Sequence, residues 1–357
     1  MSKRSFSAIG IRLLLILTIS VFVLNCVALA AETTSYPRSI VDDAGREVTI
    51  NMPVEKIIAL DSNAAKLVYL LGAQDKLIAV GDDAISRTGY LPGMKDMRSV
   101  GTWHAYDYEM IGELAKDGEK TVPNIVVLCS SSGMDPVSEV ASALKGFSDI
   151  AVIGLDAYKM ENVSQDLEKL GVVLDKENEV QKNIEWYNEK IAQIKSAVAG
   201  KTKPKVYMEM SASKGTGDLN VYGTKSSANK LIEIANGYNV CREPKTFSKV
   251  SWEWVITRNP DILLKLGSVD TLGWAAAPSK DTVTLEETRN EILNRPGANS
   301  MNAVKGDQTY IVWNSVLYGF DNVVGAAYLA KIFHPEIDLD PKEICQEYMS
   351  LLGIDFP

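Results

Sequence analysis

The chain has 357 residues, of which 46% are hydrophobic and 23% are charged, with 25 Gly and 13 Pro. These fractions are ordinary for a globular protein and exclude a disordered, collagen-like or low-complexity chain. Lys and Arg number 37 against 46 Asp and Glu, which gives a formal net charge of −9. Because a nucleic-acid-binding protein needs a basic face, this balance argues against that class. The length is too great for one core and predicts two lobes.

The N-terminus has the pattern of an export signal. Basic residues precede an apolar run over residues 13–24, and the sequence Ala28-Leu29-Ala30 has the small–x–small form that signal peptidases cleave. We therefore expect residues 1–30 to be a signal peptide that is removed near Ala30, which leaves the mature protein in the periplasm or at the cell surface. Two alternatives stay open: lipidation of Cys26, or retention of residues 13–31 as a membrane anchor.

The cysteines do not indicate a scaffold or a metal site. Four cysteines are too few for a disulfide framework, and no Cys-x-x-Cys pattern occurs. Cys129 ends the apolar run 125–128 and is predicted to be a buried thiol. The sequence leaves open whether Cys241 and Cys345 form a disulfide.

Strands and helices alternate along both halves of the chain, which indicates βαβ units and mainly parallel sheets. The elements predicted in the first half are a hairpin at 40–50, strands at 57–60, 77–80, 125–128 and 151–155, and helices at 62–71, capped by Ser62, and 137–144. Those predicted in the second half are strands at 206–210, 262–266 and 310–313, and helices at 228–235, 285–294 and 323–333.

Two pairs of segments relate the halves to each other. Residues 62–70 (SNAAKLVYL) align with 226–234 (SSANKLIEI), and residues 107–111 (DYEMI) align with 251–255 (SWEWV). Either alignment alone could arise by chance. Both occur in the same order, which predicts two lobes of one design.

A long amphipathic helix is predicted between the halves, over residues 177–199. Its apolar stripe is formed by Val180, Ile184, Tyr187, Ile191, Ile194 and Val198. We expect Asp175 to cap its N-terminus and Gly200 its C-terminus. An ordinary surface helix would show the same stripe, but the position between two α/β halves favours a connecting strut. The predicted domains are an N-terminal lobe at 37–176, this helix, and a C-terminal lobe at 200–357.

Several motifs in a fixed order resemble the solute-binding proteins of ABC importers for ferric siderophores, haem and cobalamin. They are DDAGREVT at 42–49, YEMI at 108–111, SWE at 251–253, NPD at 259–261 and the segment 328–336. The resemblance covers nearly all of the chain after Pro37. It implies an α/β fold of two Rossmann-like lobes with mainly parallel central sheets, bridged by one long α-helix, with the ligand in the cleft between the lobes.

The resemblance also gives a role to two glutamates, Glu109 and Glu253. In the family, one glutamate on each lobe docks onto basic residues of the membrane permease. Each glutamate here follows a cap candidate, Asp107 or Ser251, and lies in the first turn of a predicted helix. A carboxylate there also interacts favourably with the helix dipole without any partner. Because such a glutamate recurs at equivalent places on both lobes, docking onto the permease is the favoured interpretation.

Some candidates for ligand binding follow the predicted strands, because ligands of open α/β sheets bind beyond the carboxyl ends of the strands. Others lie in aromatic-rich sequence before the helix that carries Glu109, or are basic. The candidates are Asp61, Ser62, Arg87, Trp103, His104, Tyr106, Lys214, Tyr222, Trp274 and Trp313. Aromatic side chains suit the flat apolar faces of large chelates, although core packing is the alternative explanation for each of them. Arg87 and Lys214 suit an anionic chelate.

Other functions have little support in the sequence. The chain has only 2 His, whereas a receptor for bare Zn²⁺ or Mn²⁺ would need several. His104, Tyr106 or Tyr108 can still ligate iron in haem or in an incompletely wrapped chelate. A nucleophile elbow, a Walker loop and a GxGxxG motif are all absent from the sequence. We therefore expect no enzymatic activity.

Together with the resemblance, these observations predict the extracytoplasmic receptor of an ABC importer. We expect a monomer without a cofactor that captures an iron-siderophore-type or corrinoid chelate and delivers it to the permease and its ATPase. No nucleic-acid partner is expected. The alternatives are the same fold binding haem or another metal complex, a secreted enzyme that handles metal chelates, or a receptor that feeds a sensor.

Overall fold

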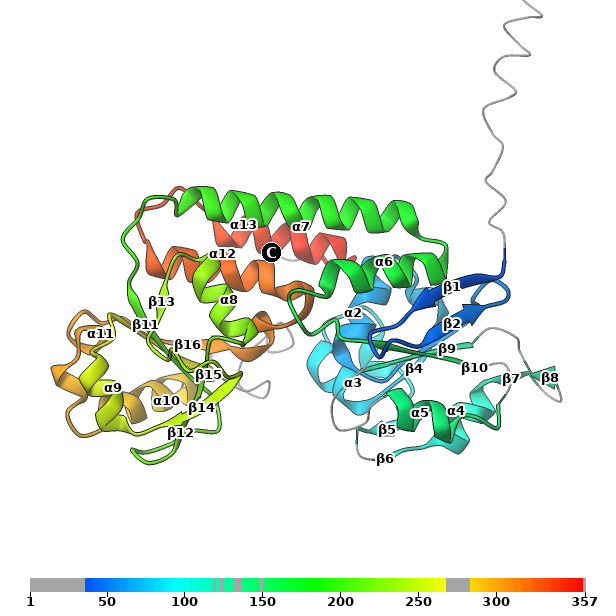
Figure 1. Cartoon of the computed structure of the whole chain (residues 1–357), viewed down its shortest axis with the longest axis horizontal. Helices are drawn as coiled ribbons and strands as arrows, with labels where there is room; N and C mark the ends of the chain where they lie inside the picture. The colour runs from blue at the N-terminus through cyan, green and yellow to red at the C-terminus, as the bar shows by residue number, and fades with distance from the viewer. Residues whose placement is uncertain are drawn as a thin grey trace, which may run out of the picture. The chain divides into compact units, whose positions relative to one another are not determined.

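Two sheets built mainly from parallel strands carry the fold (Figure 1). The computed structural model describes residues 36–103, 105–117, 120–121, 125–130, 137–147, 150–267 and 283–355. Residues Pro37–Pro357 group into one compact unit. The predicted signal peptide and Cys26 lie outside the described residues. Among the helices that are described, none combines the length and apolar character needed to cross a bilayer.

The sheet of the first half has the strand order β10-β9-β3-β4, and all of its pairings are parallel. Its strands are β3 (Lys56–Ala59), β4 (Leu77–Val80), β9 (Ile125–Ser130) and β10 (Ile150–Leu155), and the predicted hairpin is β1 (Arg38–Val41) with β2 (Glu47–Ile50). The helices are α2 (Ser62–Leu70), α3 (Asp82–Thr88), α4 (Tyr108–Leu114), α5 (Val137–Ala143) and α6 (Val163–Leu174). Two short hairpins add β5 (Gly101–Thr102) with β6 (Ala105–Tyr106) and β7 (Lys116–Asp117) with β8 (Lys120–Thr121). The predicted strands and hairpin are confirmed.

The sheet of the second half is mixed. Its order is β14-β12-β11-β15-β16, and β13 also pairs with β11. The parallel strands are β11 (Lys205–Glu209), β13 (Tyr238–Asn239), β15 (Ile262–Gly267) and β16 (Thr309–Trp313), while β12 (Leu219–Tyr222) and β14 (Phe247–Val250) are antiparallel additions that the sequence analysis did not predict. The helices are α8 (Ser227–Ile234), α9 (Trp252–Arg258), α10 (Val283–Leu293), α11 (Asn302–Lys305), α12 (Asn322–Phe333) and α13 (Pro341–Leu351).

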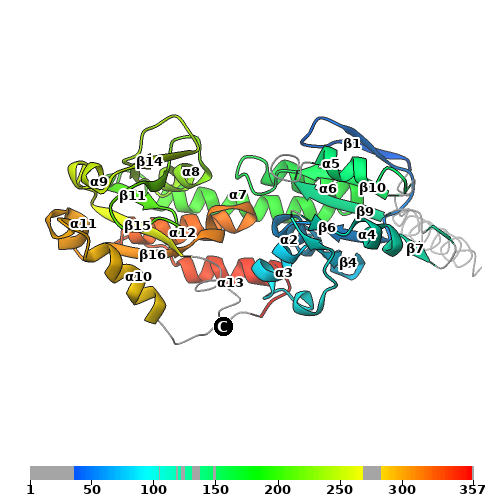
Figure 2. The same ribbon diagram turned by 90° about the horizontal axis from the view of Figure 1, so that it is seen from below.

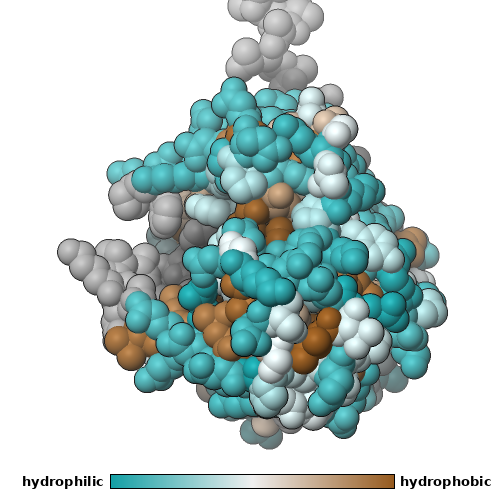
Figure 3. Space-filling view, turned by 90° about the vertical axis from the view of Figure 1, so that its left-hand side faces the viewer, coloured by the Kyte–Doolittle hydropathy of each residue, from teal (hydrophilic) through white to brown (hydrophobic). Residues whose placement is uncertain are grey.

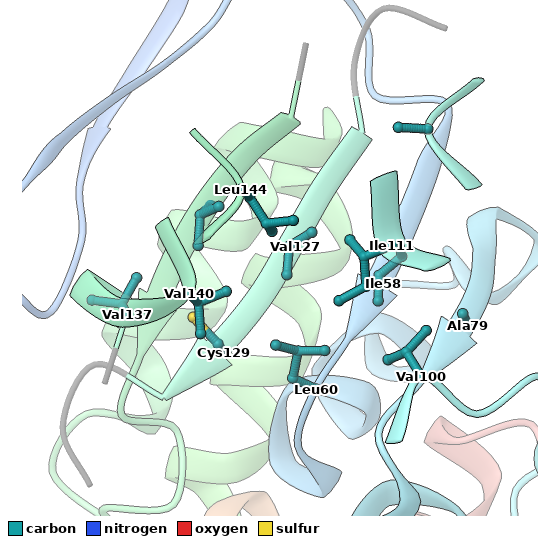
Figure 4. Close-up of a cluster of buried hydrophobic side chains, with 12 residues drawn as sticks. Ile58, Leu60, Ala79, Val100, Ile111, Val127, Cys129, Val137, Val140 and Leu144 are labelled. Carbon is teal, nitrogen blue, oxygen red and sulfur yellow. The ribbon is translucent and has the colours of Figure 1, made fainter. Parts of the chain in front are cut away.

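A cluster of fully buried aliphatic side chains fixes the first sheet against its helices (Figure 4). Val127 of β9 packs with Ile111 of α4 and Val140 of α5. Burying such side chains stabilises a fold by about 25 cal/mol per Å² of apolar surface. Cys129 belongs to this cluster, as predicted, and burial raises the pKa of its thiol. Cys241 and Cys345 are also buried and free, so no disulfide joins them.

Helix α7 (Glu177–Ala197) runs alongside α12 and extends from one sheet to the other (Figures 1 and 2). Asn183 Nδ2 donates to the carbonyl of Leu70 in the first half at 2.8 Å. One turn later, Tyr187 donates to Asn322 Oδ1 in the second half at 2.6 Å. The long helix therefore contacts both halves and bridges them, as predicted. The exact domain boundaries stay a prediction.

The predicted caps of this helix are wrong. Asp175 has φ 60° and is the C-cap of α6, while Lys176 is the N-cap residue of α7. Val198 caps the C-terminus, and Gly200, with φ 73°, lies beyond it. An acidic residue before an amphipathic run fits an N-cap by type. Asp175, which is in the left-handed conformation, instead ends the preceding helix α6. The sequence pattern alone did not distinguish these two roles.

Equivalent capping supports the relationship between the two halves. Asp107 at α4 accepts a hydrogen bond from the N–H of Met110 at 2.8 Å, and Ser251 at α9 accepts one from Trp254 at 3.3 Å. In the other aligned pair the caps differ by one position, because Ser226 caps α8 whereas its aligned residue Ser62 does not cap α2. Asp61, rather than the predicted Ser62, caps α2, because its carboxylate accepts from the N–H of residue 64 at 3.0 Å.

Candidate functional site

A polar cavity of about 240 Å³ lies where the segments after four strands meet. These strands are β3, β4 and β10 of the first sheet and β16 of the second, so the cavity lies between the halves. This is the edge at which parallel sheets bind ligands. The lining residues are Ser62, Asn63 and Lys66 of α2, Asp83, Arg87 and Thr88 of α3, Tyr158 after β10, and Ser315, Tyr318 and Asp321 after β16.

A buried ion pair joins the halves at this cavity. Lys66 Nζ donates to Asp321 Oδ2 at 3.0 Å, and the two side chains are 5% and 1% exposed. Tyr348 of α13 donates its hydroxyl proton to the other oxygen, Asp321 Oδ1. A buried charge needs such partners because desolvation is costly.

Backbone contacts hold the same junction together. The N–H of Gly319, in the 3₁₀ helix η6 (Gly319–Asp321), donates to the carbonyl of Tyr158 at 3.2 Å. Gly319 has φ 62°, and a Cβ there would lie 2.5 Å from Asn63 Oδ1. A residue with a Cβ there would be strained by this φ and would displace the Asn63 side chain, so glycine suits the close approach of the second half to α2.

Two tyrosines extend the cavity wall into the second sheet. The hydroxyl groups of Tyr222 and Tyr318 lie 3.2 Å apart, and the ring of Tyr222 packs against Phe247 with centroids 5.6 Å apart. Burial raises the pKa of both phenols, which keeps them protonated and able to donate hydrogen bonds. The Nζ atom of Lys159 lies 5.4 Å from the ring centre of Tyr158 on the opposite wall.

Three of the predicted binding residues belong to this arrangement. Ser62 and Arg87 line the cavity, and Arg87 Nε donates to Asp83 within α3. Tyr222 is one hydrogen bond away, through Tyr318. Ligand contact by these residues stays a prediction.

Asp61 and Tyr106, two further predicted binding residues, make contacts within the first half. Asp61 caps α2, and burial raises its pKa to about 6 against the opposing hydrogen bonds from the helix N–H groups. Tyr106 donates its hydroxyl proton to the carbonyl of Leu60 at 3.1 Å and packs against the core cluster. Neither residue is among the residues that line the described cavity.

The remaining candidates are not among the residues that line the cavity, or they lie outside the described chain. Trp103 is 46% exposed in the turn between β5 and β6, and Trp313 is buried at the end of β16. Lys214 is exposed between β11 and β12. His104 and Trp274 lie outside the described residues.

A buried network of charges holds the loop that carries Lys214. Glu209 accepts from Lys265 Nζ at 2.5 Å and from Arg295 Nη1 at 2.7 Å. Lys265 also donates to the carbonyl of Ser213 in this loop. These charges are paired within the second half and serve to fix the loop.

Sequence reasoning missed Lys66, Asp321, Tyr158 and Tyr318. A signal for Lys66 exists, because it is the single charged residue in the apolar run 64–71. A lysine at a helix position flanked on both sides by buried residues needs a buried partner.

Glu109 and Glu253 are both exposed in the first turn of their helices, as docking requires. Hydrogen bonds from its own backbone N–H and from Ser251 lower the pKa of Glu253, so this carboxylate is charged at neutral pH. The face of the second half near α9 and α11 is mostly hydrophilic, with small apolar patches (Figure 3). Docking itself stays a prediction.

Within the part of the chain that the structure describes, no three His, Cys, Asp or Glu side chains are grouped to hold a metal ion.

Comparison with known proteins identifies the family. Residues 57–314 match the periplasmic binding protein family. The chain belongs to this family. The vitamin B12-binding protein of Vibrio parahaemolyticus serotype O3:K6 is 24% identical over 261 residues, which cover 71% of this chain and 88% of that protein. The petrobactin-binding protein YclQ of Bacillus subtilis strain 168 is 22% identical over 245 residues, 66% of this chain and 70% of its own.

The fold of the family is confirmed by solved structures. The TroA-like periplasmic binding protein FepB from Veillonella parvula superposes with a TM-score of 0.68 at 21% identity and covers 90% of this chain and 98% of its own. The family and the fold that the sequence motifs predicted are therefore both confirmed. The fold consists of two α/β lobes bridged by one long helix.

Proposed function

We propose that this protein is the extracytoplasmic receptor of an ABC importer and captures a metal chelate between its two halves. The observation that carries the proposal is the polar cavity at the carboxyl ends of strands from both sheets. The relatives support the ligand class, since one is named for vitamin B12 and one for the siderophore petrobactin. The ligand class is thus an iron-siderophore-type or corrinoid complex.

Binding couples to the arrangement of the halves through the junction at the cavity. Lys66 and Asn63 come from the first half, and Asp321 and Tyr318 come from the second, so an occupant contacts both. A ligand shifts a conformational equilibrium only by its difference in affinity for the two states. Ligand contacts made by both halves supply this difference and favour the closed arrangement.

The closed arrangement then sets the spacing of Glu109 and Glu253, which dock onto a permease that works with its ATPase. Exposed charges mainly guide encounter and fix orientation, which suits transient delivery. The receptor transfers its ligand unchanged and is not an enzyme. It reaches its place of action by an N-terminal signal that is removed near Ala30, or it stays attached through a lipid on Cys26.

The direct test is ligand identification. Protein purified from its native host is examined by mass spectrometry and visible absorption, and titration calorimetry follows with ferric catecholate and hydroxamate complexes, haemin and cobalamin. We expect one bound chelate per chain. Asn63→Trp, which fills the cavity, should abolish binding, whereas Asn294→Trp at an exposed position of the second half should not. Absence of binding to every chelate contradicts the proposal.

A further inference from the structure

We propose that Glu291 of α10, and Arg295 just beyond the end of this helix, are positioning residues for docking onto the permease. They join the loop at 213–217, which carries Lys214, to the first turn of α9 and thereby fix the orientation in which Glu253 meets the permease. This inference rests on the proposed docking role of Glu253 and adds the residues that hold this glutamate in place.

The loop and α9 lie at the same edge of the second sheet. Strand β12 pairs antiparallel with both β11 and β14, so β11 and β14 run in the same direction and end at one edge. The loop follows β11, and α9 follows β14. They are in direct contact, because the N–H of Trp252, the first residue of α9, donates to the carbonyl of Thr216 at 3.1 Å. Glu253 is the next residue, so its orientation depends on the position of the loop.

Arg295 holds Trp252 from inside the second half. Its guanidinium carbon lies 4.8 Å from the ring centre of Trp252, and the indole Nε1 donates to the carbonyl of Pro296 at 2.9 Å. Trp252 is 1% exposed and Arg295 is 5% exposed. A cation is attracted to the face of an indole, and more strongly when both groups are removed from water. The first turn of α9 is therefore anchored on the segment that carries Arg295.

Two carboxylates fix the guanidinium itself. Glu209, the last residue of β11, accepts from Nη1 of Arg295 at 2.7 Å and from Nη2 at 2.8 Å. Glu291 accepts from Nε at 3.1 Å and from Nη2 at 2.8 Å. Such bidentate pairs restrict the orientation of a guanidinium as well as its position. The ring of Trp252 therefore packs on a planar group whose orientation is set.

The same charges hold the loop. Glu291 Oε1 accepts from the N–H of Gly215 at 2.9 Å, and Lys265 donates to the carbonyl of Ser213. Burial opposes the ionisation of Glu291, but its hydrogen bonds, foremost that from Arg295, outweigh burial and lower its pKa. Glu291 is thus charged at neutral pH and contacts both the loop and the guanidinium.

The chemistry of this network favours positioning over stability alone. Its two carboxylates and two cations balance one another within the second half. Replacing a buried ion pair by well-packed apolar residues is often neutral or stabilising. Apolar side chains could not hold the loop, however, because they offer no acceptor to a backbone N–H and no donor to a carbonyl. Residues 214–218 are exposed, so the network fixes a surface that a partner can reach.

The first half holds its docking helix by other contacts. Tyr108, which aligns with Trp252, packs partly buried against the core cluster and meets Tyr106 edge to face, with ring centres 6.4 Å apart. Glu109 therefore has a support of its own in the first half. It provides an internal comparison for the test.

A double-mutant cycle tests the inference. Affinity of the full receptor for the permease–ATPase complex of the native host, reconstituted in lipid nanodiscs, is measured by surface plasmon resonance. Glu253→Ala should weaken binding about 10-fold, and Glu291→Ala, which leaves Arg295 paired with Glu209, about 3- to 10-fold. Once Glu253→Ala is present, Glu291→Ala should change the affinity by less than about 2-fold, because no carboxylate is left to orient. Combined with Glu109→Ala, it should keep its full effect.

Further variants match these. Glu287→Ala removes an exposed carboxylate one turn earlier on α10 and should bind the permease like the wild type. Glu291→Gln keeps an oxygen that accepts from Gly215 and should restore most of the affinity. Arg295→Lys keeps the charge but loses the planar fork, so it should weaken binding as Glu291→Ala does. Amide hydrogen exchange at 213–217 should become faster in Glu291→Ala and stay near the wild-type rate in Glu291→Gln.

The outcomes separate this inference from the proposed function. Equal effects of Glu291→Ala with and without Glu253, or wild-type affinity of Glu291→Ala or Arg295→Lys, contradict the positioning role and leave docking by Glu253 in place. Wild-type affinity of Glu253→Ala contradicts the docking assignment itself.

Discussion

Lys66 and Asp321 are 255 positions apart in the chain, yet the ammonium of one lies 3.0 Å from the carboxylate of the other. The pair is buried and joins the two halves of the protein beside the candidate ligand cavity. It therefore links the contact between the two halves to the candidate site.

Removing one partner of this pair should be strongly destabilising. Lys66→Met leaves the carboxylate of Asp321 buried without its cation, which costs about 3–5 kcal/mol. The free energy of unfolding is measured by urea denaturation. Lys230→Met, which removes the exposed pair with Glu161, should cost less than about 1 kcal/mol. Equal effects of the two substitutions would show that the buried pair has no special role.

Gly319 provides a separate test of the same junction. Gly319→Ala introduces a left-handed alanine, which costs about 1–2 kcal/mol, and a Cβ that would lie 2.5 Å from Asn63 Oδ1. Gly93→Ala is the matched control, because Gly93 has φ 78° and no atom within 4 Å of its Cβ position. We expect Gly319→Ala to lower the melting temperature more than Gly93→Ala does. Adding Asn63→Ala should recover the difference, and no recovery would contradict the close contact.

The stability of the first half should depend on pH through Asp166. Burial, followed by the charge of Asp43, raises the pKa of Asp166 to about 8 from 3.8. The folded state thus holds a proton that the unfolded state releases above pH 4. The contribution of Asp166 to the free energy of unfolding is fully present below pH 3.8. It is lost as the pH rises toward 8, by at most ~1.4 kcal/mol per pH unit.

Asp166→Asn should remove this dependence. The variant is unfolded with urea at several pH values between 5 and 8, and its free energy of unfolding should fall less steeply than that of the wild type. Asp96→Asn, at an exposed position, serves as the control and should keep the wild-type slope. If the slope of Asp166→Asn equals that of the wild type, another group is responsible.

The docking glutamates are tested in cells. Glu109→Ala combined with Glu253→Ala should abolish uptake of the chelate and leave its affinity for the purified receptor unchanged, because both side chains are exposed and neither lines the cavity. Glu113→Ala is the control on the same helix, since Glu113 pairs locally with Lys116. Normal uptake by the double variant would remove the docking assignment.

Local patterns predicted most of the elements. The strand at 77–80 agrees residue for residue with β4, because a short apolar run bounded by turn residues leaves few alternatives. The antiparallel strands β12 and β14 escaped prediction, since exposed and half-buried residues alternate along β14 and weaken its apolar signal. The caps of α7 also failed, because Asp175 satisfies the preferences of both a helix start and a left-handed stop.

The site was less predictable than the fold, for a physical reason. Ser62 could be found because it follows a strand closely in the sequence, and Arg87 because a basic side chain suits an anionic chelate. Lys66 and Asp321 become a pair only when the two halves meet, and no local pattern encodes a contact between residues so far apart.

The three thiols of the described chain, Cys129, Cys241 and Cys345, are all buried. Because they are inaccessible, we expect none of these three thiols to react with a maleimide dye in the native protein. A cysteine substituted for Lys230 or Glu161, which face each other across the halves, would therefore be the one accessible thiol among the described residues. A fluorophore attached there would report in solution whether the two halves move relative to each other.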